Sequence, residues 1–465
     1  MTYLDSAYQA WMRMAPLRDA RRRCKRFAYG RQWCEPAPGK EGRTEGEEAA
    51  ASGHTPLTNN MIRQLVKCVI GTFRERLSDT DGVDYNQIGE LDARMLEEFL
   101  ISGCAIQRVS QQKRPGGSGV WVDNVSPDCF FVNDFRDPRG SDIRLIGMLH
   151  SMTRGELLMR FGADARALRT IRRGWGKDLT GDTGFAPLSA MSMLGQSESD
   201  GPADTPVSFF EAPPGRLRVI EVWTLESMPV LRCHDPLTAE AFLCPAEEAA
   251  DLRRLNGRRS KAGVAQVVSV ASATLRWHCR WLSPTGVEIA HYTSPYAHCS
   301  HPFAVKLYPL IDGEVHSLVE DIIDQQRHIN RLITLIDHIL SVSAKGALLF
   351  PTEAKPADIS WSEIAERWAR CGAVIPFDSR RTGCSPTQIV TAGENTTAFQ
   401  LLDLNMRLFQ QISGVSDALQ GRLPTANTSA ALYDSQIRSA TTALRDLLDT
   451  FDSFRQARDR LMKSA

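Results

Sequence analysis

Residues 315–341 place apolar side chains at the 3-4 spacing of one long α-helix. The apolar stripe consists of Leu318, Ile322, Ile329, Leu332, Ile333, Ile336 and Leu340. At 1.5 Å per residue this segment predicts a helix of roughly 40 Å, which is unusually long for a compact domain. Such a stripe exposes more apolar surface than one subunit easily covers, so it favours a protein that associates with copies of itself.

The rest of the C-terminal third mixes short strands with helices. The pattern predicts strands at 347–350 and 374–377 around a helix at 360–370, then helices at 396–412 and 430–454. A loop rich in Gly, Pro, Thr and Asn at 414–428 separates the last two helices. The final helix has 3-4-3-4 apolar spacing, which suits packing against a neighbouring helix of its own or of another subunit.

The first two-thirds of the chain predict helices followed by strands, and the whole therefore predicts an α+β fold. Helices are expected at 5–33 (one or two, basic, ending at Gly30), from the N-cap Thr58 to residue 76, at 88–102, and from the cap Thr153 to residue 161. Strands are expected at 105–109, 120–122, 129–132, 217–224, 264–270, 274–282, 286–293 and 303–309, with a helical insertion at 244–258. Residues 35–55 and 178–215 are expected to be loops.

Composition excludes several classes of protein. The 465 residues are 42% hydrophobic and 24% charged, which excludes disorder for the bulk of the chain. The charges of the 55 basic and 55 acidic residues cancel, so the surface as a whole does not attract nucleic acid or anionic membrane. A net charge near zero also favours self-association, because copies of the chain repel each other little. The eleven cysteines include no C-x-x-C pair. With no signal peptide or membrane span in the pattern, we expect a cytosolic product that does not enter a membrane.

Common cofactor motifs fail at defined positions. A P-loop ending at Gly176-Lys177 would have Asp178 where Ser or Thr is needed, and a calcium loop around Gly82 would have Leu77 and Ile88 at ligand positions. Zinc-type residues cluster in sequence at His278, Cys279, His291, His298, Cys299 and His301, but their spacing matches no zinc module. We therefore predict that the protein needs no metal or other cofactor.

Three acidic residues begin the long helix. Glu320, Asp321 and Asp324 stabilise a helix N-terminus through its dipole, which is the simpler explanation for them. The alternative is a metal-dependent nuclease that uses Asp321 and Asp324. The sequence leaves both interpretations open.

Five sequence fragments occur in the order found in one viral protein family. They are Tyr29-Gly30-Arg31-Gln32-Trp33, Thr58-Asn59-Asn60-Met61-Ile62, His301-Pro302-Phe303, residues 319–326 with Ile329-Asn330, and residues 412–416 with Leu419-Gln420-Gly421. Because it contains these fragments in this order, the chain resembles the portal proteins (head-to-tail connectors) of tailed double-stranded DNA bacteriophages. Another ring or adaptor protein of the virion is the nearest alternative within the same class.

The resemblance implies a structural, non-enzymatic subunit of a ring of twelve copies at one vertex of the capsid. It implies an α/β wing at 1–312, a first stem helix at 315–343, a small α/β clip at 344–392, a second stem helix at 394–413, a tunnel loop at 414–428, and a post-tunnel helix with a short crown remnant at 429–465. A full crown is not expected. The implied partners are double-stranded DNA that passes non-specifically during packaging and ejection, the major capsid protein, the terminase and tail adaptor proteins.

The same resemblance implies where DNA meets the protein. The tunnel-loop residues are Gly421, Arg422, Pro424, Asn427 and Thr428, and the stem residues are Glu320, Asp321, Asp324, Arg327 and Arg331. A channel must touch phosphates without holding them, because every fixed cation adds salt-dependent affinity that opposes sliding. A neutral subunit with one loop cation, Arg422, fits that requirement, although an ordinary interhelical turn with an exposed arginine would have the same sequence.

Overall fold

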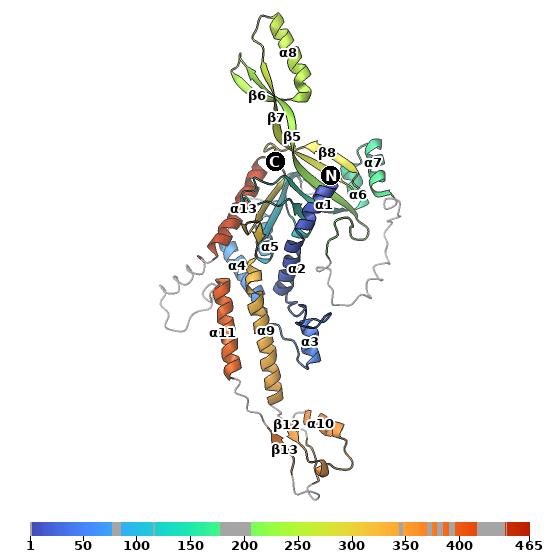
Figure 1. The fold of residues 1–465 in the computed structure, drawn as a ribbon, viewed down its shortest axis with the longest axis vertical. Coiled ribbons are helices and arrows are strands. Elements are labelled where there is room, and N and C mark those ends of the chain that lie inside the picture. Colours follow the sequence, from blue (N-terminus) through green and yellow to red (C-terminus); the bar gives the residue numbers. More distant parts are fainter. Residues whose placement is uncertain are drawn as a thin grey trace. The chain divides into compact units, whose positions relative to one another are not determined.

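The computed structural model describes most of the chain (Figure 1). The described residues are 2–76, 85–114, 117–176, 206–343, 347–369, 374–378, 385–389, 396–415, 442 and 444–465. The chain forms two compact units. Unit 1 consists of Met1–Arg23, Thr72–Ser317 and Arg445–Ala465, and unit 2 of Cys24–Gly71 and Leu318–Leu444.

Antiparallel sheets form the centre of unit 1. The larger sheet has the strand order β3-β4-β5-β7-β8, with β6 also paired to β5. Its strands are β3 (Phe130–Val132), β4 (Leu145–Met152), β5 (Leu217–Asp235), β6 (Glu240–Pro245), β7 (Val268–Leu282) and β8 (Glu288–Thr293). A smaller sheet has the order β2-β1-β9, made by β1 (Cys104–Arg114), β2 (Gly117–Asn124) and β9 (Phe303–Leu307). A short hairpin follows, formed by β10 (Pro309–Ile311) and β11 (Glu314–Val315).

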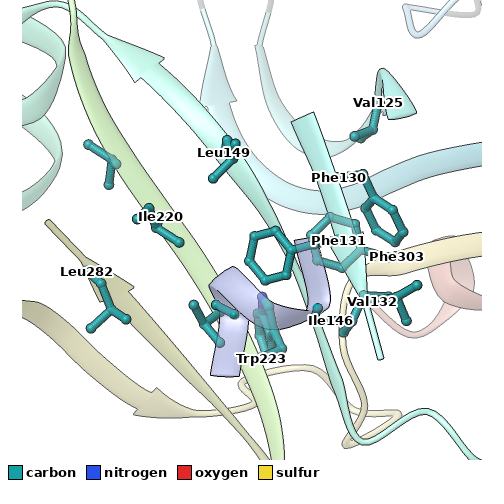
Figure 2. Packing of buried hydrophobic residues seen from close by; sticks show 14 of the residues in the cluster. Val125, Phe130, Phe131, Val132, Ile146, Leu149, Ile220, Trp223, Leu282 and Phe303 are labelled. Atoms are coloured by element: carbon teal, nitrogen blue, oxygen red, sulfur yellow. The ribbon is translucent and has the colours of Figure 1, made fainter. Parts of the chain in front are cut away.

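The main core of unit 1 lies where these sheets meet. Val132, Ile146 and Trp223 occupy opposed register positions on β3, β4 and β5, so they share one face of the sheet (Figure 2). Phe130 meets Phe303 of β9 edge-to-face, with ring centroids 5.8 Å apart, and this contact joins the two sheets.

The far halves of β5 and β7 carry an arm that also includes β6 and α8 (Ala249–Lys261). A small core of Cys233, Cys244, Leu252 and Val267 holds the arm together. The predicted helical insertion is confirmed, displaced by a few residues. The two strands predicted at 264–270 and 274–282 are one strand, because β7 pairs with β5 without a break from Val268 to Leu282.

Most helices of unit 1 follow the sequence pattern, but the helix at Ala165–Trp175 is not predicted and the last helix continues to Lys463, beyond the predicted end at 454. The helices are α1 (Tyr3–Arg13), the first part of α2 (Ala15–Ala28), α5 (Ile88–Ser102), α6 (Arg154–Phe161), α7 (Ala165–Trp175) and α13 (Arg445–Lys463), with short 3₁₀ turns at Pro127–Cys129 and Ala246–Glu248. The predicted cap Thr153 is confirmed, since its hydroxyl accepts a hydrogen bond from the Glu156 amide at 3.2 Å. The predicted loop at 178–215 lies mostly outside the described residues.

The C-terminal helix α13 packs within its own subunit. Its side chains Leu447, Leu448, Phe451 and Phe454 are buried, and the Phe451 ring lies 5.6 Å from Phe99 of α5. The helix also contacts β1 and β9. Of the two alternatives for the predicted 430–454 stripe, Leu447, Phe451 and Phe454 therefore follow the first, because they pack against α5 and the β2-β1-β9 sheet of their own subunit.

Unit 2 is built on two long helices. Its elements are α3 (Glu45–Ala51), most of α4 (Met61–Arg76), α9 (Leu318–Ser343), β12 (Ala347–Leu349), a 3₁₀ turn at Thr352–Ala354, α10 (Trp361–Ala369), β13 (Thr387–Ile389) and α11 (Thr396–Ser413). The predicted long helix and the helix at 396–412 are confirmed, and they lie side by side as α9 and α11 (Figure 1).

Three local predictions in unit 2 are wrong. The predicted strand at 374–377 is irregular, and β12 pairs with β13 instead. The 35–55 loop contains α3, which starts with a capping box between Thr44 and Glu47. The N-cap of α4 is not Thr58. The helix begins at Met61, and the Asn60 side chain accepts a hydrogen bond from the Arg63 amide at 3.0 Å.

Candidate functional site

Two of the predicted stem residues share one buried carboxylate. Arg327 and Arg331 lie one turn apart on α9, and both donate to Oε1 of Glu45, at 2.6 Å from Arg331. Glu45 begins α3 and is only 7% exposed. Burial opposes charge on Arg327, but the hydrogen bond to Glu45 outweighs it, so the pKa of Arg327 is raised. These two cations are therefore held within their own subunit.

Buried amides continue this network along α9. The Gln326 side chain accepts a hydrogen bond from the Met61 amide at 3.0 Å and donates to the Asn59 carbonyl at 2.6 Å. One turn further, the Asn330 side chain donates to Gln32 at 2.6 Å. Because a buried amide without a partner is costly, these bonds fix the segment before α4 in one register against the long helix.

The acidic stem residues are not part of this buried network. Asp321 and Asp324 are exposed, and Glu320 is half-buried. The Asp324 carboxylate lies 3.6 Å from Arg327. Within the described part of the chain, no three His, Cys, Asp or Glu residues are grouped so that they could hold a metal ion. The nuclease alternative, which needs such a group at Asp321 and Asp324, gains no support here.

Glu45→Gln should lower the free energy of unfolding by about 2–3 kcal/mol, because two arginines lose a charged acceptor and one of them is mostly buried. Urea denaturation monitored by circular dichroism measures this. Glu41→Gln, the same change at an exposed position nearby, is the matched control and should stay within about 0.5 kcal/mol of wild type. Equal stability of the two variants would contradict the assigned role of Glu45.

The histidine and cysteine cluster does not form a ligand set. His278 and His291 are neighbours on β7 and β8, with Nδ1 and Nε2 3.3 Å apart, while Cys279 is buried. His301 packs edge-on against Trp277, with ring centroids 4.8 Å apart, and its Nδ1 accepts a hydrogen bond from the Phe303 amide. Cys299 is exposed. These side chains serve packing and turn formation.

The partly buried His301 predicts a pH dependence of stability. Burial, with a smaller contribution from His298, lowers its pKa from 6.5 to about 4. The unfolded chain therefore binds a proton near pH 6.5 that the folded chain does not bind until about pH 4. Stability should be constant above this window and fall by on the order of 2 kcal/mol as pH drops through it.

His301→Asn retains an acceptor for the Phe303 amide and should flatten this part of the pH profile. Denaturation curves at several pH values between 4 and 7 measure the change. His234→Asn, at an exposed histidine, is the control and should leave the profile unchanged. A His301→Asn profile as steep as that of wild type would show that another group is responsible.

The predicted tunnel-loop residues Gly421, Arg422, Pro424, Asn427 and Thr428 lie outside the described residues. The start of the loop is described. Gly414 has φ +67°, a conformation that favours glycine, and it ends α11. The Val415 amide then donates to the Ser413 hydroxyl at 3.3 Å.

Sequence reasoning missed the partners of the long helix. Glu45, Gln32 and Asn60 all lie in or next to segments that the sequence pattern predicts to be loops or helix ends. Two signals were present. Thr44-x-x-Glu47 is a capping-box pattern, and Gln326 and Asn330 are an i, i+4 amide pair facing the buried side of an otherwise apolar helix.

The α9–α11 pair leaves large apolar side chains in solvent. Ile329, Ile336 and Phe409 are buried. Other apolar side chains of the same two helices are 43–51% exposed, and these are Leu335, Leu340, Phe399, Leu401, Leu404 and Ile412. None of the described helices is long and apolar enough to span a membrane.

These features define an α+β subunit in which long paired helices keep an apolar surface outside the subunit's own core. The family model of the phage P22-like portal protein matches residues 92–464. Because this match covers most of the chain, the chain belongs to the P22-like phage portal protein family, and the predicted resemblance is confirmed. No curated protein gives a significant match. The protein is thus a phage portal protein, a structural component of the virion.

Proposed function

We propose that copies of this chain assemble into a closed ring at one capsid vertex, and that viral double-stranded DNA is packaged and ejected through its axial channel. The observation that carries this proposal is the exposed apolar surface of α9 and α11. Six large apolar side chains on two helices are relieved of unfavourable exposure to water when another surface covers them. In a portal protein that surface is supplied by the next copy, in a head-to-tail contact that closes into a ring.

Within such a ring the parts keep the roles that the resemblance implies. Residues 1–312 form the wing, α9 and α11 the stem, and 344–392, with β12, α10 and β13, the clip. Residues 414–428 form the tunnel loop and 429–465 the post-tunnel helix. Twelve copies surround the channel, the wing meets the major capsid protein, and the outer end receives first the terminase and later the tail adaptors.

The charges of α9 support passage of DNA without retention. Arg327 and Arg331 are already bound to Glu45, while Asp321 and Asp324 are exposed. Phosphates moving past such a stem meet few free cations, and each cation removed lowers the salt-dependent affinity that would slow sliding. The proposed role is structural, with no catalytic step.

Arg422→Ala should leave ring assembly unchanged while reducing the amount of DNA packaged or retained, because a loop cation contributes little to folding but directly to phosphate contact. DNA content of particles carrying the variant, measured over a range of salt concentrations, is the readout. Arg253→Ala, at an exposed arginine of α8 in the arm, is the control and should package and retain DNA like wild type. If particles with Arg422→Ala packaged and retained DNA normally at every salt concentration, Arg422 would not be a DNA contact in the channel.

Negative-stain electron microscopy of the purified protein tests the proposed architecture. A ring with an axial hole supports it. A compact monomer at micromolar concentration and moderate salt would contradict it and favour the nuclease alternative.

A further inference from the structure

Helix α7 is a strongly basic surface in unit 1. Arg166, Arg169, Arg172 and Arg173 are all exposed, and at 3.6 residues per turn they occupy a sector of about 120°. The opposite side of the helix, with Ile171 and Trp175, is buried against the sheet near β8 (Figure 1). The four guanidinium groups therefore face solvent together.

Two acidic residues close to α7 in the sequence are used for helix capping. Asp164 accepts a hydrogen bond from the Ala167 amide at 2.7 Å, and Glu156 forms the capping box of α6 with Thr153. Among the described residues no carboxylate pairs with the four arginines. A chain whose net charge is zero thus presents, on one face of α7, four arginines that have no carboxylate partner among the described residues.

A pocket of about 440 Å³ adjoins the end of this helix. Trp175, the last residue of α7, lines it together with Arg154, Arg216 and Arg218. Arg218 is 3% exposed and donates to the Glu211 carbonyl at 3.0 Å and to the Ser151 hydroxyl at 2.9 Å. These acceptors are neutral, so its charge is not cancelled there. One exposed carboxylate, Glu211, also lines the pocket, which leaves arginine in excess.

We propose that the arginine face of α7 and the arginine-lined pocket at its end form a second DNA-binding surface that holds the phosphate backbone of double-stranded DNA. All seven cations are arginines. Arginine is the residue best suited to phosphate because its planar guanidinium donates two parallel hydrogen bonds to it. Four side chains along an 11-residue helix can meet successive phosphates without reading sequence.

The choice of DNA over an acidic polypeptide rests on the proposed function, which brings double-stranded DNA to this protein. The surface differs from the proposed channel in chemistry. The stem presents acids and paired arginines, whereas the arginines of α7 have no carboxylate partner in the described part of the chain, so α7 should hold DNA where the stem lets it slide.

Covalently closed circular DNA tests this surface separately from the channel, because a circle has no end to thread through a closed ring. The full-length protein is compared with a variant carrying R166Q, R169Q, R172Q and R173Q. The matched control removes four charges from exposed positions of another helix, α8, as R253Q, R254Q, R258Q and K261Q. Filter retention of labelled DNA between 50 and 200 mM salt gives the affinity and its salt dependence.

We expect the α7 variant to bind at least about tenfold more weakly at low salt, with a salt slope reduced by about 0.9 for each phosphate that the variant no longer neutralises. The α8 control should bind within about twofold of wild type. Equal weakening in both variants, or no binding by wild type, would overturn the proposal. So would wild-type binding of poly-glutamate through α7 with unchanged DNA binding, which would identify an acidic protein as the partner.

Native mass of each variant is measured in parallel. If the wild type is not a ring, the proposed function fails, while the comparison of α7 with α8 variants still decides the DNA-binding surface. If all variants are rings and the affinities do not differ, only the inference about α7 fails.

Discussion

Asp92→Ala should lower the free energy of unfolding by about 3–5 kcal/mol, the largest stability effect that we expect in this protein. Asp92 of α5 is fully buried. Its carboxylate accepts hydrogen bonds from Arg458 and, at 2.9 Å, from Arg455, both on α13. Arg458 is 1% exposed. Removal of the carboxylate leaves the buried guanidinium with only the half-exposed Asp459, 2.8 Å away, as a counter-charge, and the attachment of α13 to α5 weakens.

Urea denaturation of full-length protein measures this effect. Asp452→Ala is the matched control, because Asp452 is half exposed and also binds Arg455, so its removal should cost about 1 kcal/mol or less. The double variant Asp92→Leu with Arg458→Met should recover much of the stability, since apolar replacement of a buried ion pair is often neutral. An Asp92→Ala protein as stable as the Asp452→Ala protein would show that this ion pair does not anchor α13.

Leu401→Asp with Leu404→Asp should abolish ring formation while the subunit stays folded. Both leucines are about half exposed on α11, so charge there costs the monomer little. In the ring, each would bury an uncompensated carboxylate at every interface between copies. We expect native mass to shift from ring to monomer, with unchanged circular dichroism.

Leu237→Asp, the same substitution at an exposed leucine of the β5–β6 turn in the arm, is the control and should still form rings. Intact rings of the α11 double variant would mean that the exposed apolar surface of the helix pair is not the contact between copies.

Elements with strong local patterns could be predicted from sequence. The 3-4 spacing of α5, α9 and α11 indicates their positions to within a few residues, because each buries one apolar stripe. Elements that depend on distant partners could not be predicted. β13 has three residues and exists through pairing with β12, and β7 is a single strand because β5 continues beside it.

The candidate site was predictable only in part. The charged positions of α9 are visible in sequence, but the sequence does not say that Arg327 and Arg331 both reach Glu45, 282 and 286 residues away. That pairing depends on how α3 lies within unit 2. Similarly, the spacing of the four arginines in the sequence indicates that they share one face of α7. Their lack of acidic partners among the described residues depends on the fold and cannot be predicted from that spacing.

Native mass spectrometry of the wild-type protein at micromolar concentration tests the central claim most directly. A closed portal ring of twelve 51.7-kDa subunits predicts a single species of about 620 kDa that persists in moderate salt. A stable 51.7-kDa monomer under the same conditions would contradict the account.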